Sequence, residues 1–480
     1  MPVVDPRPSS TSPARRSPAD RRWAALWLLC ASQLMVILDG SIVAVALPVI
    51  GEDLDVSGPA LTWVVNAYLV PFGGLLLLAG RLGDLLGPRR ILLGGLGVFT
   101  VASVLCGLAP SIEVLVAARF AQGIGGALAS AVVLGMIVTL FPEPSERGRA
   151  LGAFGFVGAA GSSIGLLAGG LLTTGLSWPW IFLVNLPLGA AAVFGVRRLV
   201  PAPPGTGGRA DLPGAVLVTA GLMLAVLVLL STDADVATTG LLALAAAGLL
   251  AGFLLRQART AAPLLPLRLL TNRPVGLGNL VQVLMIAGLF GYQFLGVLYL
   301  QQLLGYDPLQ AGLAYLPVPL LIAAVSLGLS ARLITRFGTR TVLVTGLTLI
   351  TAGLALLTGL PASGAYLPDL LPAGLLIAVG FGLSFPALAA TAVGSAPTND
   401  AGVASGLFNT TQQVGGALGL AFLTRLATSA TGGSSAAVAT AHLDGYHLAF
   451  AAAATLSAIA LLLALPATAT INGAVIGRRR

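Results

Sequence analysis

The sequence predicts an all-α polytopic membrane protein, and three observations support that fold class. Hydrophobic residues make up 56% of the 480 positions and charged residues only 9%, with a mean hydropathy of +0.96. A soluble protein carries about 25% charged residues, so this composition excludes an ordinary soluble domain. Fourteen apolar runs follow one another, each near the ~20 residues that a helix needs to cross a bilayer. The arginines fall in short gaps between these runs, which is typical of a membrane topology signal.

We expect fourteen transmembrane helices in a lipid bilayer. Their predicted bounds are 23–48, 61–80, 90–109, 112–140, 149–173, 178–198, 212–231, 239–256, 275–298, 310–331, 341–359, 368–392, 403–428 and 445–466. Residues 1–22, before the first run, are rich in Pro, Ser and Arg, which predicts a disordered cytoplasmic tail with no cleavable signal peptide. An even number of spans places both termini on one side of the membrane.

The 25 arginines predict which side that is. With the N-terminus inside, 23 of them lie on the cytoplasmic side, in the tails, the inner connections or the inner ends of the spans, and none falls in a predicted outer connection. The other two, Arg119 and Arg425, lie within predicted spans. Because basic connections stay in the cytoplasm, we expect a cell-membrane protein with both termini cytoplasmic. This placement also argues against a nucleic-acid partner, although the net charge is +8.

An internal repeat predicts two similar halves. GRLGDLLGPRR at 80–90 is similar to ARLITRFGTRT at 331–341, which begins 251 positions later. Two halves with the same orientation are a parallel-repeat transporter architecture, and six helices per half leave spans seven and eight as an inserted pair. The expected parts are a six-helix bundle at 23–200, a linker with two extra helices at 201–274, a second bundle at 275–470 and a basic tail at 471–480.

One acidic residue lies deep inside an apolar run. Asp39 stands in the middle of the first span, in LMVILDGSIVAVALP. A carboxylate at the bilayer centre costs about 2.5–3.5 kcal/mol on insertion scales, so it is expected to be paired, protonatable or both. Counting about 1.5 Å per residue places Arg119 of the fourth span at a similar depth. We expect the two residues to pair, because a buried pair costs less than two isolated charges.

These motifs together resemble the major facilitator superfamily, specifically its 14-helix drug:proton antiporters of the QacA/EmrB type. The resemblance runs from LDGSIVAVALP in the first helix to AGVASGLFNTTQQVGGALG in the thirteenth. It implies two six-helix bundles plus two inserted central helices, and a cavity lined by the first and fourth helices. It also implies alternating access with a proton handled by Asp39 and Arg119. A static structural pair is the alternative reading of these two residues.

The connection between the second and third helices matches the superfamily's motif. The matching residues are Gly80, Arg81, Asp84, Gly87, Arg89 and Arg90. In the family this loop latches the two halves at the cytoplasmic face and helps to govern the conformational switch; a solvated turn is the simpler alternative. The second copy has Thr335 at the position of Asp84, which predicts a weaker charge network there.

The fifth helix resembles the family's antiporter motif in altered form. Its glycines are Gly152, Gly161, Gly165, Gly169 and Gly170. Three of them recur every four residues, which predicts a face of small residues for close helix packing. Leu166 stands where the family usually has proline, and Pro179 replaces an arginine in the following segment. Without the proline, we expect a reduced bend in this helix.

Polar stripes on two helices and a family-like motif on a third are the candidates for substrate contact. Asn279, Gln282 and Gln293 fall within an arc of about 60° on the ninth helix, and such a stripe faces protein or water rather than lipid. Hydrogen bonding between helices would explain the stripe equally well. The candidates on the thirteenth and second helices are Asn409, Gln412, Trp63 and Asn66, with helix packing and interfacial anchoring as the alternatives.

The predicted function is proton-coupled export of small amphipathic organic compounds by a monomer, without a metal or cofactor. A uniporter or metabolite importer on the same fold is the alternative within transport. A polytopic membrane enzyme is less favoured, since His442 and His447 have no nearby set of metal ligands. The sequence contains no P-loop motif, which argues against ATP as the energy source, and no ring of charges that would favour a channel.

Overall fold

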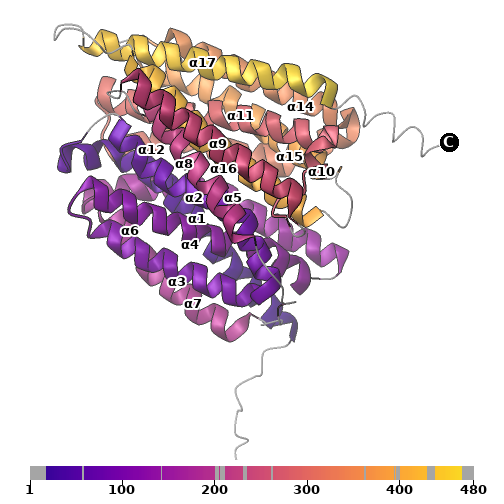
Figure 1. Ribbon diagram of the computed structural model, residues 1–480. Coiled ribbons are helices and arrows are strands. Elements are labelled where there is room, and N and C mark those ends of the chain that lie inside the picture. Colours follow the sequence, from indigo (N-terminus) through magenta and orange to yellow (C-terminus); the bar gives the residue numbers. More distant parts are fainter. Residues whose placement is uncertain are drawn as a thin grey trace, which may run out of the picture.

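The computed structural model describes residues 18–56, 59–141, 143–200, 205, 211–230, 235–260, 263–361, 364–393, 395, 401–429 and 438–467. Within these ranges the chain is helical and contains no strand, so the predicted all-α fold class is confirmed (Figure 1). The first half contains α1 (Pro18–Asp53), α2 (Pro59–Leu86), α3 (Pro88–Gly107), α4 (Ile112–Leu140), α5 (Pro144–Gly175), α6 (Trp180–Leu183) and α7 (Asn185–Leu199). The remaining helices are α8 (Leu212–Leu230), α9 (Val236–Arg259), α10 (Arg268–Thr271), α11 (Arg273–Leu298), α12 (Pro308–Tyr315), α13 (Pro317–Ala324), α14 (Ala331–Leu356), α15 (Leu371–Ala392), α16 (Ala401–Ser429) and α17 (Val438–Ala467).

Each predicted span coincides with one helix or with consecutive helical segments. Among the described residues, eleven segments are long and apolar enough to cross a membrane, and one of them, Pro308–Gly359, contains the predicted tenth and eleventh spans. The predicted fifth and thirteenth spans lie on α5 and α16. The chain is therefore a multi-pass membrane protein with approximately the predicted number of helices.

Helices within each half of the chain pack against one another. In the first half α1 packs on α5, and α4 packs on both α2 and α3; in the second half α11 packs on α16 and α17, and α14 packs on α15. The α3–α4 contact is close because a Cβ on Gly95 would lie 2.8 Å from the carbonyl oxygen of Gly125. Such contacts between backbones are how small residues stabilise helix pairs in membranes.

The two copies of the repeat share an unusual backbone conformation. Gly87, directly before α3, has a φ of 98°, and Gly338, 251 positions later, has a φ of 82° and kinks α14. Residues with a Cβ rarely adopt such angles, so glycine is required where each connection turns into its next transmembrane segment. The repeat is thus visible in the backbone, although Thr335 occupies the position of Asp84 in the second copy.

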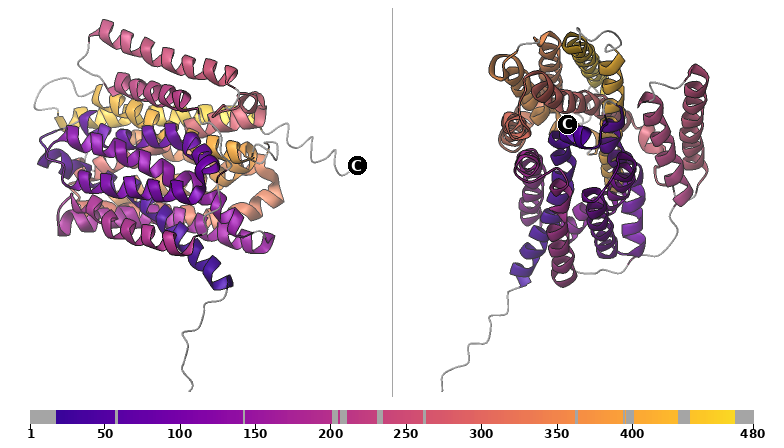
Figure 2. Two further views of the ribbon diagram at one scale, coloured as in Figure 1. Left: turned by 60° about the horizontal axis from the view of Figure 1, so that its bottom comes forward. Right: turned by 90° about the vertical axis from the view of Figure 1, so that its left-hand side faces the viewer.

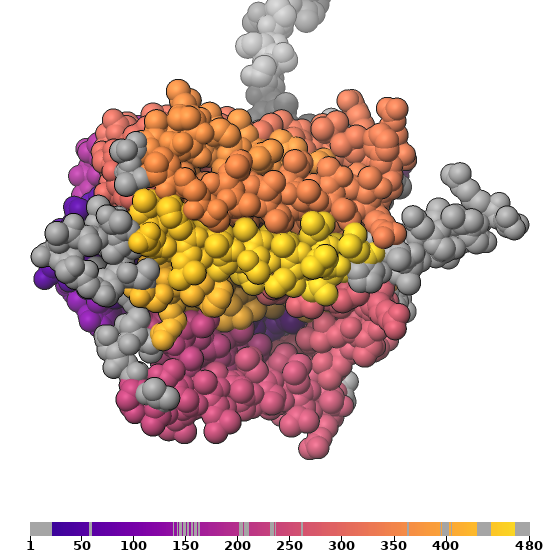
Figure 3. Space-filling model, turned by 90° about the horizontal axis from the view of Figure 1, so that it is seen from above, coloured from indigo at the N-terminus to yellow at the C-terminus, as the bar shows by residue number. Residues whose placement is uncertain are grey.

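The α8–α9 pair lies on the outside of the molecule (Figure 2). Of its two helices, α8 packs on both α2 and α16, whereas α9 packs mainly on α8. Asp211 joins the pair at one end by accepting hydrogen bonds from Arg256 Nε (2.6 Å) and Gln257 Nε2 (2.9 Å). Burial raises the pKa of Asp211, but these two bonds and one from the Gly214 N–H outweigh it and hold the pKa below its ordinary value. A groove separates the pair from α17 (Figure 3).

A cavity of about 2060 Å³ lies between the two halves and reaches the end of the molecule at which α1 begins, where Arg81, Leu140 and Val403 line it. We call this the N-terminal end. At the opposite end α5 packs on α12, and a Cβ on Gly170 would lie 2.7 Å from Leu309 Cα. Gln301 Nε2 also donates to the Val45 carbonyl at 3.0 Å, which joins the halves there. The cavity is therefore closed at one end.

We predict that Gly87→Ala lowers the free energy of unfolding by about 1–3 kcal/mol, because alanine at a φ of 98° is strained. Chemical unfolding of the detergent-solubilised protein, followed by tryptophan fluorescence, measures this. Gly94→Ala in α3 is the control: a Cβ there meets nothing within 4 Å, and alanine is the better helix former. Equal destabilisation by both variants would contradict the prediction.

Candidate functional site

An ion pair lies buried between α1 and α4. Arg119 Nη1 is 2.6 Å from Asp39 Oδ2, and the two side chains are 1% and 0% exposed. The expected contact between these residues is therefore present. Because the ion pair is shielded from water, the attraction between its two charges is much stronger than that of an ion pair at a protein surface.

Three further polar side chains complete the hydrogen bonding of the pair. Gln122 Nε2 and Asn185 Nδ2 donate to Asp39 Oδ1 at 2.7 Å and 2.9 Å, and both amides also donate to Ser103 Oγ, at 2.8 Å and 3.3 Å. Gln122 Oε1 in turn accepts from Arg119 Nη1 at 2.7 Å. We call these five residues the Asp39 cluster. A buried ion pair is stable only when its remaining hydrogen-bonding capacity is satisfied in this way.

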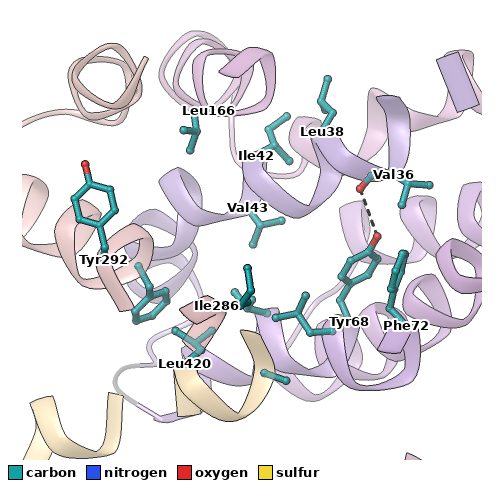
Figure 4. Packing of buried hydrophobic residues seen from close by; sticks show 14 of the residues in the cluster. Val36, Leu38, Ile42, Val43, Tyr68, Phe72, Leu166, Ile286, Tyr292 and Leu420 are labelled. Atoms are coloured by element: carbon teal, nitrogen blue, oxygen red, sulfur yellow. Dashed lines mark hydrogen bonds between the residues drawn. The ribbon is translucent and has the colours of Figure 1, made fainter. Parts of the chain in front are cut away.

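The guanidinium of Arg119 is oriented by α2. Its Nε donates to the Val64 carbonyl at 2.9 Å, and its central carbon lies 4.4 Å from the centre of the Tyr68 ring. The Tyr68 hydroxyl donates to the Val36 carbonyl on α1 at 3.4 Å, the dashed line in Figure 4. A cation above an aromatic ring is attracted by the electron-rich face of the ring, so Tyr68 stabilises the charge of Arg119 as well as fixing its position.

The Asp39 cluster borders the cavity. Tyr68 and Arg119 line the cavity, as do Val36 and Gly40 on either side of Asp39 along α1. Asp39 itself is not part of the lining. The carboxylate is therefore screened from the cavity, whereas its partner Arg119 lines it.

The glycines of α5 hold α1 in place next to the cluster. A Cβ on Gly161 would lie 2.9 Å from Leu34 Cδ1, one on Gly165 would lie 2.9 Å from the Leu38 carbonyl, and one on Gly169 would lie 2.6 Å from the Ile42 carbonyl. Because these contacts flank Asp39, any larger side chain on this face would push α1 away from its partners. Gly170 contacts α12 instead, and the surroundings of Gly152 are not among those that the structure describes. The helix runs unbroken through Leu166.

The motif residues between α2 and α3 divide into two groups. Gly80, Arg81 and Asp84 line the N-terminal end of the cavity. The other three surround the start of α3: Gly87 makes the turn, the Arg89 guanidinium donates to the Arg197 carbonyl at the end of α7, and Arg90 is exposed. One part of the motif therefore faces the cavity while the other fastens α3 to α7.

The substrate candidates are not all brought together. Gln293, Asn409 and Gln412 line the cavity. Asn279 lies instead in the α11–α16 contact, where its Oδ1 accepts from Thr411 Oγ1 at 2.8 Å. The remaining three, Gln282, Asn66 and Trp63, are not part of the lining: the first two are fully buried, and the third packs against the core.

Sequence reasoning missed three members of the Asp39 cluster. Ser103, Gln122 and Asn185 are common residue types in membrane helices. Only the positions of the two amides in the sequence could have indicated that they belong to the cluster. Gln122 follows Arg119 by three positions and so shares its face of α4, and Asn185 is a lone amide in an apolar run.

Comparison with known proteins places the chain among transporters. The family model described as Major Facilitator Superfamily matches residues 29–420. The puromycin resistance protein pur8 of Streptomyces alboniger is 41% identical over 467 residues, covering 94% of this chain and 92% of that protein. The cephamycin export protein CmcT of Amycolatopsis lactamdurans is 40% identical, covering 90% of each chain.

Solved structures agree in fold. The human organic anion transporter MFSD10 (TETRAN) superimposes with a TM-score of 0.62 at 17% identity, over 92% of this chain and 99% of that chain. The nucleoside transporter NupG gives a TM-score of 0.66 at 12% identity, with the same coverage. At this identity the two structures support the fold alone.

We predict that Arg119→Met lowers the free energy of unfolding by about 3–5 kcal/mol, because it leaves a buried carboxylate without its counter-charge. In the double variant Asp39→Asn/Arg119→Met, the loss should be smaller than the sum of the single losses by about 1–3 kcal/mol. Chemical unfolding in detergent gives the free energy of unfolding of the wild type, of both single variants and of the double variant, which together form a double-mutant cycle.

The pair of Arg22 and Glu146 provides the control cycle. Their charged atoms are 3.4 Å apart but the two side chains are 39% and 33% exposed, so a coupling no larger than about 1 kcal/mol is expected for Arg22→Met with Glu146→Gln. Additive losses in the Asp39–Arg119 cycle would show that the two charges do not stabilise each other.

Proposed function

Because this chain belongs to the major facilitator superfamily, we propose that it exports small organic compounds, antibiotics among them, in exchange for protons. Membership makes the chain a membrane transporter of small molecules and not an enzyme. The observation that carries the proposed proton coupling is the buried Asp39–Arg119 pair at the wall of a large cavity. The direction of transport is supported by the relatives, whose names describe resistance and export.

In the proposed cycle Asp39 is the proton carrier. When the carboxylate takes up a proton, it loses its charge, and Arg119 loses the partner that holds it against α1. Arg119 keeps its bond to the Val64 carbonyl and its position over Tyr68, so its charge then acts on the cavity. Protonation at a buried site is thereby converted into a change at the surface that the substrate contacts.

Packing links this event to the rest of the molecule. The glycine face of α5 fastens α1, and hence Asp39, to the helix whose far end closes the cavity against α12. A shift of α1 relative to α4 therefore displaces the contact between Gly170 and Leu309. The proposed switch rocks the parts at 23–200 and 275–470 against each other, with Arg81 and Asp84 controlling the N-terminal end.

The proposed orientation follows from the arginines. With both termini on the cytoplasmic side of the cell membrane, the cavity described here faces the cytoplasm. A proton that enters down a potential of 100 mV releases about 2.3 kcal/mol, which can drive a modest gradient of substrate. We further propose that a monomer is the working unit and that the basic residues serve membrane topology rather than nucleic-acid binding.

Inverted membrane vesicles with an acidic interior test the coupling. Addition of puromycin, the compound in the name of one relative, should release part of the proton gradient, as reported by a quenched pH-sensitive dye. We predict that Asp39→Asn lowers the rate of this release at least tenfold, because asparagine cannot carry a proton. Its Oδ1 can still accept from Gln122 and Asn185, whereas its Nδ2 cannot accept from Arg119.

Asp307→Asn is the matched control. Asp307 caps α12 at an exposed position, and asparagine caps a helix equally well, so release should remain at the wild-type level. Release by Asp39→Asn equal to that of the wild type would reject Asp39 as the proton carrier. Substrate movement that ignores the proton gradient in the wild type would identify a uniporter.

A further inference from the structure

Carboxamides and aromatic rings form much of the wall of the cavity. Gln293 of α11 and three neighbouring residues of α16, Asn409, Gln412 and Gln413, line it. Counting about 1.5 Å per residue from the start of each helix, Gln293 lies about 30 Å and Gln412 about 16 Å from the N-terminal end. Hydrogen-bonding groups are therefore available at two depths, on helices that run parallel to each other.

Aromatic side chains form a second part of the same wall. Phe381 and Phe385 of α15 line the cavity with their ring centres 5.2 Å apart, and Phe408 supports Phe385 from behind at 5.5 Å. At the closed end Tyr292 and Tyr315 line the cavity with their ring centres 5.4 Å apart. Flat apolar surfaces of this kind stack on planar rings of a ligand.

The charges of the lining are few and unevenly placed. Among the described lining residues, Arg81 and Asp84 carry opposite charges at the N-terminal end, three positions apart on α2. Deeper in the cavity the charged lining residue is Arg119, whose partner Asp39 is buried outside the lining and accepts from Arg119, Gln122 and Asn185. A cation that reaches the closed end therefore meets a guanidinium first, whereas a carbonyl or hydroxyl meets hydrogen-bond donors.

From this arrangement we propose that the cavity selects planar aromatic compounds that are uncharged when they bind and that carry carbonyl or hydroxyl groups, over permanent cations of the same size. Gln293 and Gln412 would bind the polar groups, and Phe381 and Phe385 would stack on the rings. At the closed end a cation would lose its hydration without gaining a counter-charge from the described lining residues, since Asp84 lies at the other end. This inference rests on the proposed function and specifies the substrates of the same cavity.

Two matched ligands test the selection. Acridone is a neutral tricyclic compound with one carbonyl, and 10-methylacridinium is a permanent cation on nearly the same ring system. Fluorescence titration of the purified full-length protein in detergent should show at least tenfold tighter binding of acridone. Equal or tighter binding of the cation, or no binding of acridone, would overturn the proposal.

A designed charge tests the reason for the selection. Gln293→Glu places a carboxylate at the closed end of the cavity, and at pH 8 the ratio of the two affinities should shift at least tenfold toward 10-methylacridinium. Gln310→Glu is the control: Gln310 is exposed on α12, and glutamate keeps its capping bond with Asp307, so the ratio should stay at the wild-type value. An unchanged ratio in Gln293→Glu would show that charge in the cavity does not decide selection.

These binding measurements need no proton gradient. Selection of acridone without proton release in vesicles would therefore reject the proposed antiport while supporting this inference. Proton release driven by 10-methylacridinium and not by acridone would support antiport and reject the inference.

Discussion

A carboxylate in the middle of an apolar bundle needs a counter-charge and hydrogen-bond donors, and this requirement organises the first half of the molecule. Asp39 on α1 accepts from Arg119 and Gln122 on α4 and from Asn185 on α7, and Ser103 on α3 joins the cluster by accepting from the two amides. A fourth helix, α2, orients the guanidinium. Because all these side chains meet at one point, their helices cannot move independently without breaking a buried polar contact.

Hydropathy and the positions of the arginines were sufficient to predict the helical fold. The contact between Asp39 and Arg119 could also be anticipated, because each is a charge in an apolar run and depth along a helix can be counted from the sequence. The remaining cluster members could not, since a serine or an amide in a membrane helix has many acceptable partners. Which of them faces Asp39 depends on the rotation of α3, α4 and α7 about their axes, and tertiary packing sets that rotation.

The polar stripe on α11 shows the limit of periodicity. Asn279 and Gln293 share one face of an ideal helix, but they lie about 21 Å apart along its axis. Over that distance the neighbours of the face change, from α16 at Asn279 to the cavity at Gln293.

The two halves contribute different groups to the site: the first contains the buried ion pair, and the second supplies most of the carboxamides and stacked rings.

The position of α8 has a consequence for the rate of transport. This helix packs on α2 in the first half and on α16 in the second, where Arg425 Nη1 donates to the Leu229 carbonyl. If the two halves rotate against each other as proposed above, at least one of these two interfaces has to slide. The rate of the proposed rotation is therefore expected to depend also on the side chains and the lipid around α8, far from the ion pair. The same transport chemistry can then run at different rates in membranes of different thickness and fluidity.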